Sequence, residues 1–413
     1  MTLENWKTVF LPEVTFFQEG PGVRKSQFRK EGVKLLNVRN LVNNKLETSN
    51  TETCISEEEA TTKYKHFLID EDDLIIASSG ISPDTFYKKV AFAEKENLPL
   101  CMNTSTIRFK SVSSDLLDIK FFRYFLMTDV FANQVRKFIT GSAQLNFGPS
   151  HLKKMKMPLP PIETQREITK ILEKAEGIRK SREQANQMAN KFLQAEFLHI
   201  FSLERANREN WQFEFLQELA LPVKGAIQSG PFGSDLHNSD FVNEGILAIG
   251  VDNVYANKFV IGRGRHITQK KYQELVKFTA RPKDVLVTVM GTVGRSCVFP
   301  ISVGPAIITK HIYRISLDQE KCIPEFLSSA LNWDTEIRKQ LGASITGAIV
   351  DGLTSKTIKS IKVRIPPIQL QIHFVELLSK YNVLQRNQLV SSHEIGHLFD
   401  SLMSKAFNGE LVS

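Results

Sequence analysis

The chain of 413 residues has no apolar run of 18 residues, which is the length that a membrane-spanning helix needs. Its first residues, MTLENWKTVF, lack the apolar core of a secretory signal peptide. The four cysteines, Cys54, Cys101, Cys297 and Cys322, form no CxxC pair and no short-range pair. Disulfides and thiolate metal sites are therefore not expected. These absences predict a cytoplasmic protein with reduced thiols and no contact with a membrane.

Motifs of catalysis are also missing. The sequence contains no GxxxxGK[ST] phosphate loop. The glycine-containing stretch GTVGR at 291–295 lacks the lysine of that motif. Two double prolines resemble the NPPY motif of amino-methyltransferases, but Leu159 and Ile365 stand where that motif has asparagine. We therefore expect a non-catalytic chain without a cofactor.

One motif points elsewhere, because His393-Glu394-Ile395-Gly396-His397 is a literal HExxH. On a helix this spacing places two histidines on one face for Zn²⁺, with the glutamate as general base, so a zinc peptidase is a remote alternative. No third ligand follows at the usual spacing, and Ile395 falls in an apolar seam. We therefore expect no metal site.

The composition is that of a folded protein, with 42% hydrophobic and 24% charged residues. The net charge is +8, which favours a polyanionic partner, because contacts to phosphates supply much of the affinity for nucleic acid. Charge alone does not separate nucleic-acid binding from other functions.

A tandem repeat organises the chain. The stretch ITGSAQLNFGPSHLKKMKMPLPPIETQREI (139–168) returns as ITGAIVDGLTSKTIKSIKVRIPPIQLQIHF (345–374). The offset is 206 residues without a gap, and Asn5-Trp6 matches Asn210-Trp211 at an offset of 205. One unit of roughly 200 residues, large enough for its own core, is therefore used twice.

Each repeat has a globular segment of mixed strands and helices. In the first, apolar runs predict strands over 33–38, 73–79, 90–93, 104–109 and 153–159 and a helix over 119–138. In the second they predict strands over 246–251, 285–290, 297–300, 307–317 and 359–365 and a helix over 324–341. The fold class is therefore α/β (α+β).

A long helix follows each globular segment. The prolines at 160–161 and 366–367 suit a first helical turn, because proline lacks an N–H that would be unpaired there. About forty residues with steps of three and four then predict two coiled-coil helices, each about 60 Å long. Their seams are expected at Ile168, Ile171, Ala175, Ile178, Arg182, Ala185, Ala189 and Phe192, and at Phe374, Leu377, Tyr381, Leu384, Gln388, Ser391, Ile395, Leu398 and Leu402. Because a short loop joins the first helix to the second segment, the helices are expected to run antiparallel about a pseudo-two-fold axis.

Six motifs follow one another along the chain: GSAQLNF (141–147), LPPIETQREI (159–168), SGPFGSDL (229–236), DVLVTVMGTVGR (284–295), IPPIQLQIHF (365–374) and LMSKAFNGEL (402–411). With these motifs in this order, the chain resembles the specificity (S) subunit of type I restriction-modification enzymes over essentially its whole length. The resemblance implies target recognition domains at 1–160 and 208–366, each reading one half of a bipartite sequence in double-stranded DNA. It implies spacer helices at 161–207 and 367–413 that dock two methyltransferase (M) subunits, with restriction (R) subunits joining through the complex. A stand-alone DNA-binding scaffold is the alternative.

Basic, amide and loop residues are the candidates for DNA contact, since arginine suits guanine and Gln or Asn suits adenine. In the first segment they are Arg24, Lys25, Arg29, Lys30, Arg39, Gln144 and Asn146. In the second they are Ser229, Gly230, Phe232, Gly233, Ser234, Arg263, Arg265, His266, Lys270, Lys271, Thr292, Arg295 and Lys310, with the glycines expected to let the backbone approach the duplex. The helix junctions, implied as docking points, are Pro160, Pro161, Gln165, Pro366, Pro367 and Gln371.

Overall fold

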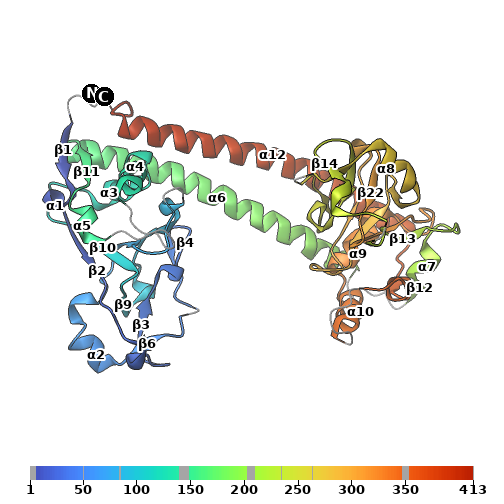
Figure 1. Cartoon of the computed structure of the whole chain (residues 1–413), viewed down its shortest axis with the longest axis horizontal. Helices are drawn as coiled ribbons and strands as arrows, with labels where there is room; N and C mark the ends of the chain where they lie inside the picture. The colour runs from blue at the N-terminus through green and yellow to red at the C-terminus, as the bar shows by residue number, and fades with distance from the viewer. Residues whose placement is uncertain are drawn as a thin grey trace. The chain divides into compact units, whose positions relative to one another are not determined.

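The structure is a computed structural model in which the chain forms two compact units. It describes residues 6–49, 51–82, 85–138, 148–201, 210–233, 235–262, 264–346 and 353–412, without the side chains of Asn190 and residues 343–346. Unit 1 comprises Met1–Glu183 and Val390–Ser413, and unit 2 comprises Gln184–Leu389 (Figure 1). Each unit therefore contains the first part of one long helix and the last part of the other.

Unit 1 is built on a four-stranded antiparallel sheet. Its order is β2 (Thr15–Glu19), β10 (Thr106–Ser111), β7 (Leu74–Ala77) and β8 (Val90–Phe92). Every residue of β7 is buried, as expected for a central strand of apolar residues. The helix α3 (Ile119–Leu126) packs on this sheet, with the Phe122 ring centre 5.1 Å from that of Phe109.

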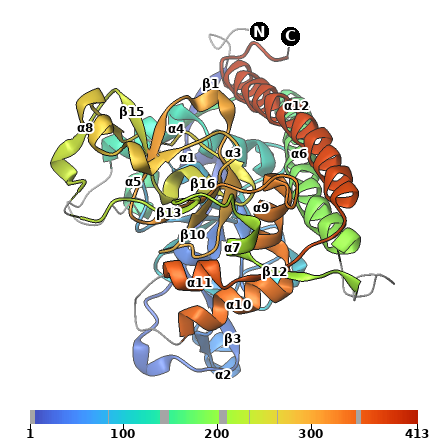
Figure 2. The ribbon, with the colours of Figure 1, turned by 90° about the vertical axis from the view of Figure 1, so that its right-hand side faces the viewer.

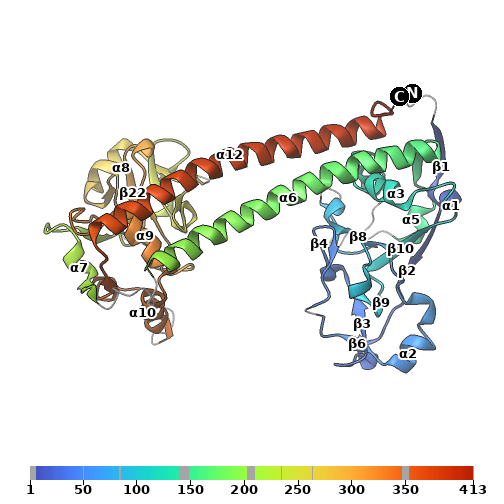
Figure 3. The same cartoon turned by 180° about the vertical axis from the view of Figure 1, so that it is seen from behind.

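A smaller sheet extends unit 1. Its order is β6 (Cys54–Ile55), β3 (Val33–Leu36) and β9 (Leu100–Met102), and β3 pairs in parallel with β9. With α2 (Glu57–Thr61) it lies at the end of the domain away from the start of the long helix (Figures 1 and 3). The strands β4 (Leu41–Val42) and β5 (Lys45–Leu46) form a short hairpin, and β1 (Lys7–Phe10) pairs with β11 (Lys156–Leu159) ahead of that helix.

Unit 2 contains a four-stranded sheet with the same arrangement. Its order is β13 (Ile227–Ser229), β23 (Ile312–Ile315), β20 (Val285–Thr288) and β21 (Ser296–Val298). A five-stranded sheet joins β14 (Phe241–Val242), β18 (His266–Ile267), β15 (Ile246–Ile249), β22 (Ala306–Ile308) and β19 (Thr279–Ala280), and Figure 2 turns this unit toward the viewer. Two pairs remain, β16 (Val254–Tyr255) with β17 (Lys258–Phe259) and β12 (Phe213–Phe215) with β24 (Lys362–Arg364). The mixed α/β class is confirmed.

Several predicted elements are split. The helix predicted over 119–138 is α3 followed by α4 (Asp129–Phe138), and that predicted over 324–341 is α9 (Pro324–Trp333) followed by α10 (Thr335–Thr346). The breaks are caps, since the Thr128 hydroxyl accepts from the Phe131 N–H at 3.3 Å and the Asp334 carboxylate accepts from the Ile337 N–H at 3.0 Å. The strand predicted over 307–317 is likewise two strands, β22 and β23.

The long helices α6 (Ile162–Phe201) and α12 (Ile368–Phe407) have 40 residues each. In unit 1 the start of α6 shares a core with the end of α12, and the Arg179 guanidinium lies 4.4 Å from the ring centre of Phe399. In unit 2 the end of α6 meets the start of α12, where the rings of Phe197 and Phe374 are 5.2 Å apart. The two helices are therefore antiparallel within each unit. None of the described helices is long and apolar enough to cross a membrane.

The predicted seam is wrong in five places, one of which is Ala185, an exposed residue. Ile178, Phe192, Leu384 and Leu398 are 50%, 58%, 60% and 54% exposed. The inward positions are one residue later, at Arg179, Leu193, Gln385 and Phe399, which are buried or half-buried. The prediction applied a strict 3.5-residue period, whereas an α-helix has 3.6 residues per turn, so the inward stripe drifts along forty residues.

Candidate nucleic-acid interface

In unit 2, three segments meet where the four-stranded sheet ends in loops. They are residues 229–233 after β13, 289–295 between β20 and β21, and 309–311 before β23. Backbone hydrogen bonds join them, from the Gly230 N–H to the Ile312 carbonyl at 3.1 Å and from the Val289 N–H to the His311 carbonyl at 3.0 Å. We call this edge the loop end of unit 2. It brings together seven predicted DNA contacts, Ser229, Gly230, Phe232, Gly233, Thr292, Arg295 and Lys310.

The loop end of unit 2 is rich in cations. Burial, together with the charges of Lys310 and Arg265, lowers the pKa of His311. The Arg295 guanidinium lies 5.3 Å from the ring centre of Tyr255, and its Nη1 donates to the Val254 carbonyl at 3.5 Å. The Phe232 side chain is 72% exposed. Cations beside an exposed aromatic ring suit a polyanion that also presents flat bases.

The packing of the chain's own backbone requires a glycine at position 230. The residue is buried, and a Cβ there would lie 2.2 Å from the carbonyl carbon of Thr309. The expectation that this backbone is open to a duplex therefore does not describe Gly230, because the chain's own backbone fills the space. Gly233, which is exposed with nothing within 4 Å of its Cβ direction, keeps that freedom.

Four other predicted residues belong to a different sheet. Arg265 and His266 lie at β18, and Lys270 and Lys271 lie on α8 (Gln269–Glu274). The Arg265 guanidinium pairs with Asp252 at 2.7 Å. Lys271 pairs with Glu274 at 3.1 Å and Asp240 at 3.6 Å, contacts that raise its pKa. Arg265 and Lys271 therefore already have protein partners, although the charge of Arg265 reaches the loop end.

Unit 1 has a corresponding loop end. It consists of Glu19 at the end of β2, the described residues 78–82 and 85–89 between β7 and β8, and residues 103–105 before β10. The Gly20 N–H donates to the Thr106 carbonyl at 3.0 Å, and a Cβ at Gly20 would lie 2.3 Å from the Asn103 carbonyl oxygen. The same close approach as in unit 2 therefore closes this edge.

The short helix that carries Arg39 also reaches this edge. The Val38 N–H donates to the Ser105 hydroxyl at 3.1 Å, and the Lys89 ammonium donates to the Leu41 carbonyl at 2.5 Å. Lys88, which the sequence analysis left out, is exposed beside it. Its only sequence signal was two adjacent lysines, which are common on any surface.

The remaining predicted residues of unit 1 are spread out. Arg24, Lys25, Arg29 and Lys30 are all exposed after β2, and the Arg29 guanidinium donates to the Ser26 and Phe28 carbonyls at 3.0 Å. The predicted contacts Gln144, Asn146, Ser234 and Arg263 lie outside the described residues.

At the helix junctions, Gln165 and Gln371 are wholly buried. The Gln165 amide accepts from the Asp118 N–H at 2.9 Å and donates to the Leu116 and Pro160 carbonyls at 3.0 and 2.8 Å. The Gln371 amide accepts from the Ile323 N–H at 2.9 Å and donates to the Lys321 and Pro366 carbonyls at 3.2 and 3.0 Å. Both glutamines lie near the starts of the long helices, where these helices follow the globular segments. Their side chains cannot dock a partner, because the chain's own backbone uses every polar group. Pro160 and Pro366 are buried as well, whereas Pro161 and Pro367 are exposed.

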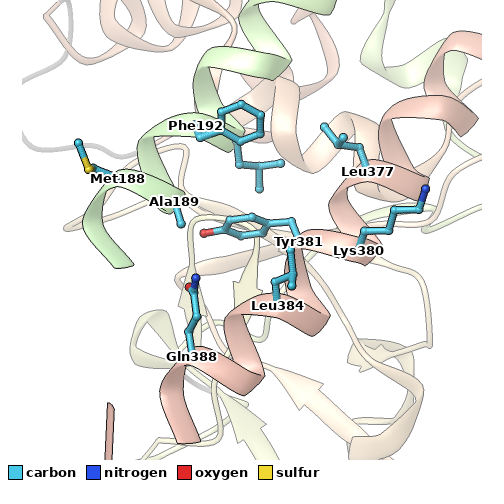
Figure 4. A pocket seen from close by; sticks show the side chains of 9 residues that line it. Met188, Ala189, Phe192, Leu377, Lys380, Tyr381, Leu384 and Gln388 are labelled. Carbon is cyan, nitrogen blue, oxygen red and sulfur yellow. The ribbon is translucent and has the colours of Figure 1, made fainter. Parts of the chain in front are cut away.

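The long helices expose several apolar side chains among their charged ones. Besides Ile178, Phe192, Leu384 and Leu398, the exposed apolar residues include Met188, Val383, Leu389 and Val390. In unit 2 a groove of about 400 Å³ lies between the two helices, where Met188 and Phe192 of α6 face Tyr381, Leu384 and Gln388 of α12 (Figure 4). Contiguous exposed apolar surface of this kind marks contact with another protein.

The HExxH stretch lies on an exposed face of α12. The Nε2 atoms of His393 and His397 are 2.9 Å apart. Across the part of the chain that the structure describes, no group of three His, Cys, Asp or Glu residues is arranged to hold a metal ion. A hydrogen-bonded histidine pair without a third ligand is not a zinc-peptidase centre.

Each unit thus has a four-stranded sheet that ends in a corresponding set of loops, and each contains parts of both long antiparallel helices. Residues 3–187 match the family described as type I restriction modification DNA specificity domain. The chain is similar to the specificity (S) subunits of type I restriction-modification systems. Subunits of this family are the non-catalytic, DNA-recognising components of those systems.

Individual relatives are distant. The specificity subunit of the type I restriction enzyme MjaVIII from Methanocaldococcus jannaschii is 26% identical over 197 residues, which is 46% of this chain and 45% of that protein. The EcoBI specificity subunit from Escherichia coli is 21% identical over 444 residues, covering 99% of this chain and 87% of that protein.

Two solved structures share the fold. One is the S subunit of a type I system from M. genitalium, with a TM-score of 0.55 at 16% identity, covering 98% of this chain and 96% of that one. The other is a chain from a structure described as the structural basis of complex assembly and conformational transition of the type I R-M system. Its TM-score is 0.59 at 17% identity, and the match covers 98% of both chains.

Proposed function

We propose that this chain reads a bipartite sequence in double-stranded DNA, one half-site per unit, and docks two methyltransferase subunits. The observation that carries the proposal is the pair of loop ends. Both close on a buried glycine at the end of the first strand of the sheet, yet they present different side chains. Thr104 and Ser105 of unit 1 stand where unit 2 has Lys310 and His311. A common frame with unlike side chains suits two readers of different sequences.

The chemistry of the loop ends supports contact with the major groove. Lysine and arginine donate to guanine O6 and N7, whereas asparagine suits adenine. Lys310 and Arg295 supply such donors in unit 2, and Arg39 with Asn103 supplies them in unit 1. The peripheral cations, such as Arg24 and Lys270, suit phosphates, which position a protein without specifying a sequence.

The docking surface that we propose is the outer face of the helices, not the junction glutamines. Ile178, Phe192, Leu384 and Leu398 are exposed, and Phe192 and Leu384 line the groove between the helices of unit 2. Burying side chains of this size stabilises a complex by about 1.5–3 kcal/mol each. Restriction subunits would join through the methyltransferase subunits, and the complex would work in the cytoplasm, where its DNA lies.

We further propose that the recognition domains are residues 1–160 and 208–366, and that the spacer helices are 161–207 and 367–413. The test exchanges residues 5–158 for the matching segment of another such subunit, in complex with the methyltransferase subunits. Methylome sequencing should show one half-site changed and the other kept. A chain that binds its target without any methyltransferase subunit, or a swap that changes both half-sites or neither, contradicts the proposal.

A further inference from the structure

The loop end of unit 1 carries a carboxylate, that of Glu19. Glu19 is the last residue of β2 and is half-buried. The Ser78 hydroxyl donates to its Oε1 at 3.4 Å, and the same hydroxyl contacts the Thr104 carbonyl at 3.0 Å. No lysine or arginine forms an ion pair with Glu19 among the residues placed in the structure, and the undescribed stretch 139–147, ITGSAQLNF, contains none in its sequence. Among the residues that the structure describes, the Glu19 carboxylate thus has no ion pair, and the Ser78 hydroxyl is its one hydrogen-bond donor.

The position of Glu19 is set by the backbone and not by its own contacts. Gly20 presses against Asn103 so closely that no Cβ fits, which holds the end of β2 against the start of β10. In unit 2 the same approach, between Gly230 and Thr309, follows Ser229. The carboxylate thus occupies a position of the frame that is occupied by a serine in the other unit.

A carboxylate on a DNA-facing edge cannot contact phosphates, because like charges repel. It can only approach a base edge that offers hydrogen-bond donors and little else. Cytosine presents its N4 amino group as its sole polar group in the major groove, whereas adenine adds the N7 acceptor and guanine and thymine present acceptors.

We propose that Glu19 is a specificity-determining residue whose carboxylate accepts a hydrogen bond from the N4 amino group of a cytosine in one half-site. This inference rests on the proposed function of the loop ends. Ser78 is a positioning residue, since its hydroxyl orients the carboxylate. Because Ser229 replaces the carboxylate in unit 2, the other half-site has no cytosine read in this way.

The test uses the chain in complex with its methyltransferase subunits. The probes are duplexes with the mapped target in which each base pair of each half-site is replaced in turn. The native complex should methylate duplexes with cytosine at one position of the first half-site about tenfold or more faster than duplexes with another base there. One good contact to a base provides a preference of this size. Glu19→Gln and Glu19→Ser should both lose that preference and leave the second half-site unchanged.

A matched control is Glu96→Gln. Glu96 is an exposed glutamate in the connection after β8, which leaves the sheet at the end opposite the loop end, so this change of charge should not alter any preference. Thermal unfolding separates reading from a structural role. Burial raises the pKa of Glu19, so the ionised group opposes folding and Glu19→Gln should not lower the Tm.

Four results overturn the inference. They are an unchanged preference at every position in both variants, loss of a preference for a base other than cytosine, an altered second half-site, and a lowered Tm with methylation lost on all sequences. The proposed function is judged separately by the exchange of residues 5–158. If that exchange changes the first half-site while the Glu19 variants do not, the inference about Glu19 fails alone.

Discussion

Replacing Gln165 by alanine should destabilise unit 1 selectively. The change removes the amide that joins the start of α6 to the loop before α3. The Asp118 N–H and the Leu116 and Pro160 carbonyls then lose a partner at a site where Gln165 itself is 0% exposed. An unpaired buried polar group costs about 1–3 kcal/mol. Two of the three bonds are only partly buried, so water can replace part of them, and we expect a loss of about 3–4 kcal/mol.

Hydrogen exchange with mass spectrometry measures this change unit by unit. Amides of α3 and of the first turns of α6 should exchange faster in Gln165→Ala, whereas unit 2 keeps its protection. Gln371→Ala should do the converse, because its amide makes the matching bonds in unit 2. Lys170→Ala, an exposed site on the same helix, is the control.

The isosteric change Gln165→Glu sharpens the test. A carboxylate can accept from the Asp118 N–H but cannot donate to the Leu116 and Pro160 carbonyls, which would repel it. Its pKa in the folded chain should therefore rise above the unfolded value, so stability is greatest at low pH and is lost as the pH rises through the folded value. The free energy of unfolding of Gln165→Ala could lie within about 0.5 kcal/mol of that of the native chain, or both units could lose protection equally. Either result would show that the hydrogen bonds of the Gln165 amide do not hold this junction together.

Three further predictions follow from other parts of the chain. Four helix-forming residues inserted after both Ala185 and Ser391 lengthen each helix by about 6 Å. Methylome mapping should then show unchanged half-sites separated by a spacer that is longer by one or two base pairs. An unchanged spacer in an active complex would contradict the idea that the long helices set the distance between the half-sites. Burial raises the pKa of Glu176, but its hydrogen bonds to Arg123 and Tyr124 more than offset this effect and hold the pKa below 4.5. The stability of unit 1 should therefore fall as the pH drops below 4.5, and it should fall less steeply in Glu176→Gln. Unfolding measured from about pH 3 to 6 tests this. His393→Ala and His397→Ala should leave methylation intact, and metal analysis of the native chain should find no stoichiometric zinc.

The sequence alone was sufficient for features that depend on local order. The proline pairs and the apolar pattern predicted two helices of about forty residues, and α6 and α12 have that length. Their bounds differ by 206 residues, from Ile162 to Ile368 and from Phe201 to Phe407, which is the offset between the matching stretches of sequence. Helix starts are set by neighbouring residues, so a single sequence shows them.

The tertiary structure decided which side chains face inward and which residues share a surface. Whether Ile178 or Arg179 faces the partner helix depends on the drift of a 3.6-residue period along a packed pair, which a short window of sequence does not resolve. Gln165 was predicted at a junction, yet its burial follows from bonds to residues 47 and 49 positions earlier in the chain. Glu19, Ser78 and Thr104 meet only because β2, β7 and β10 pair in one sheet, and such long-range pairing leaves no trace in local composition.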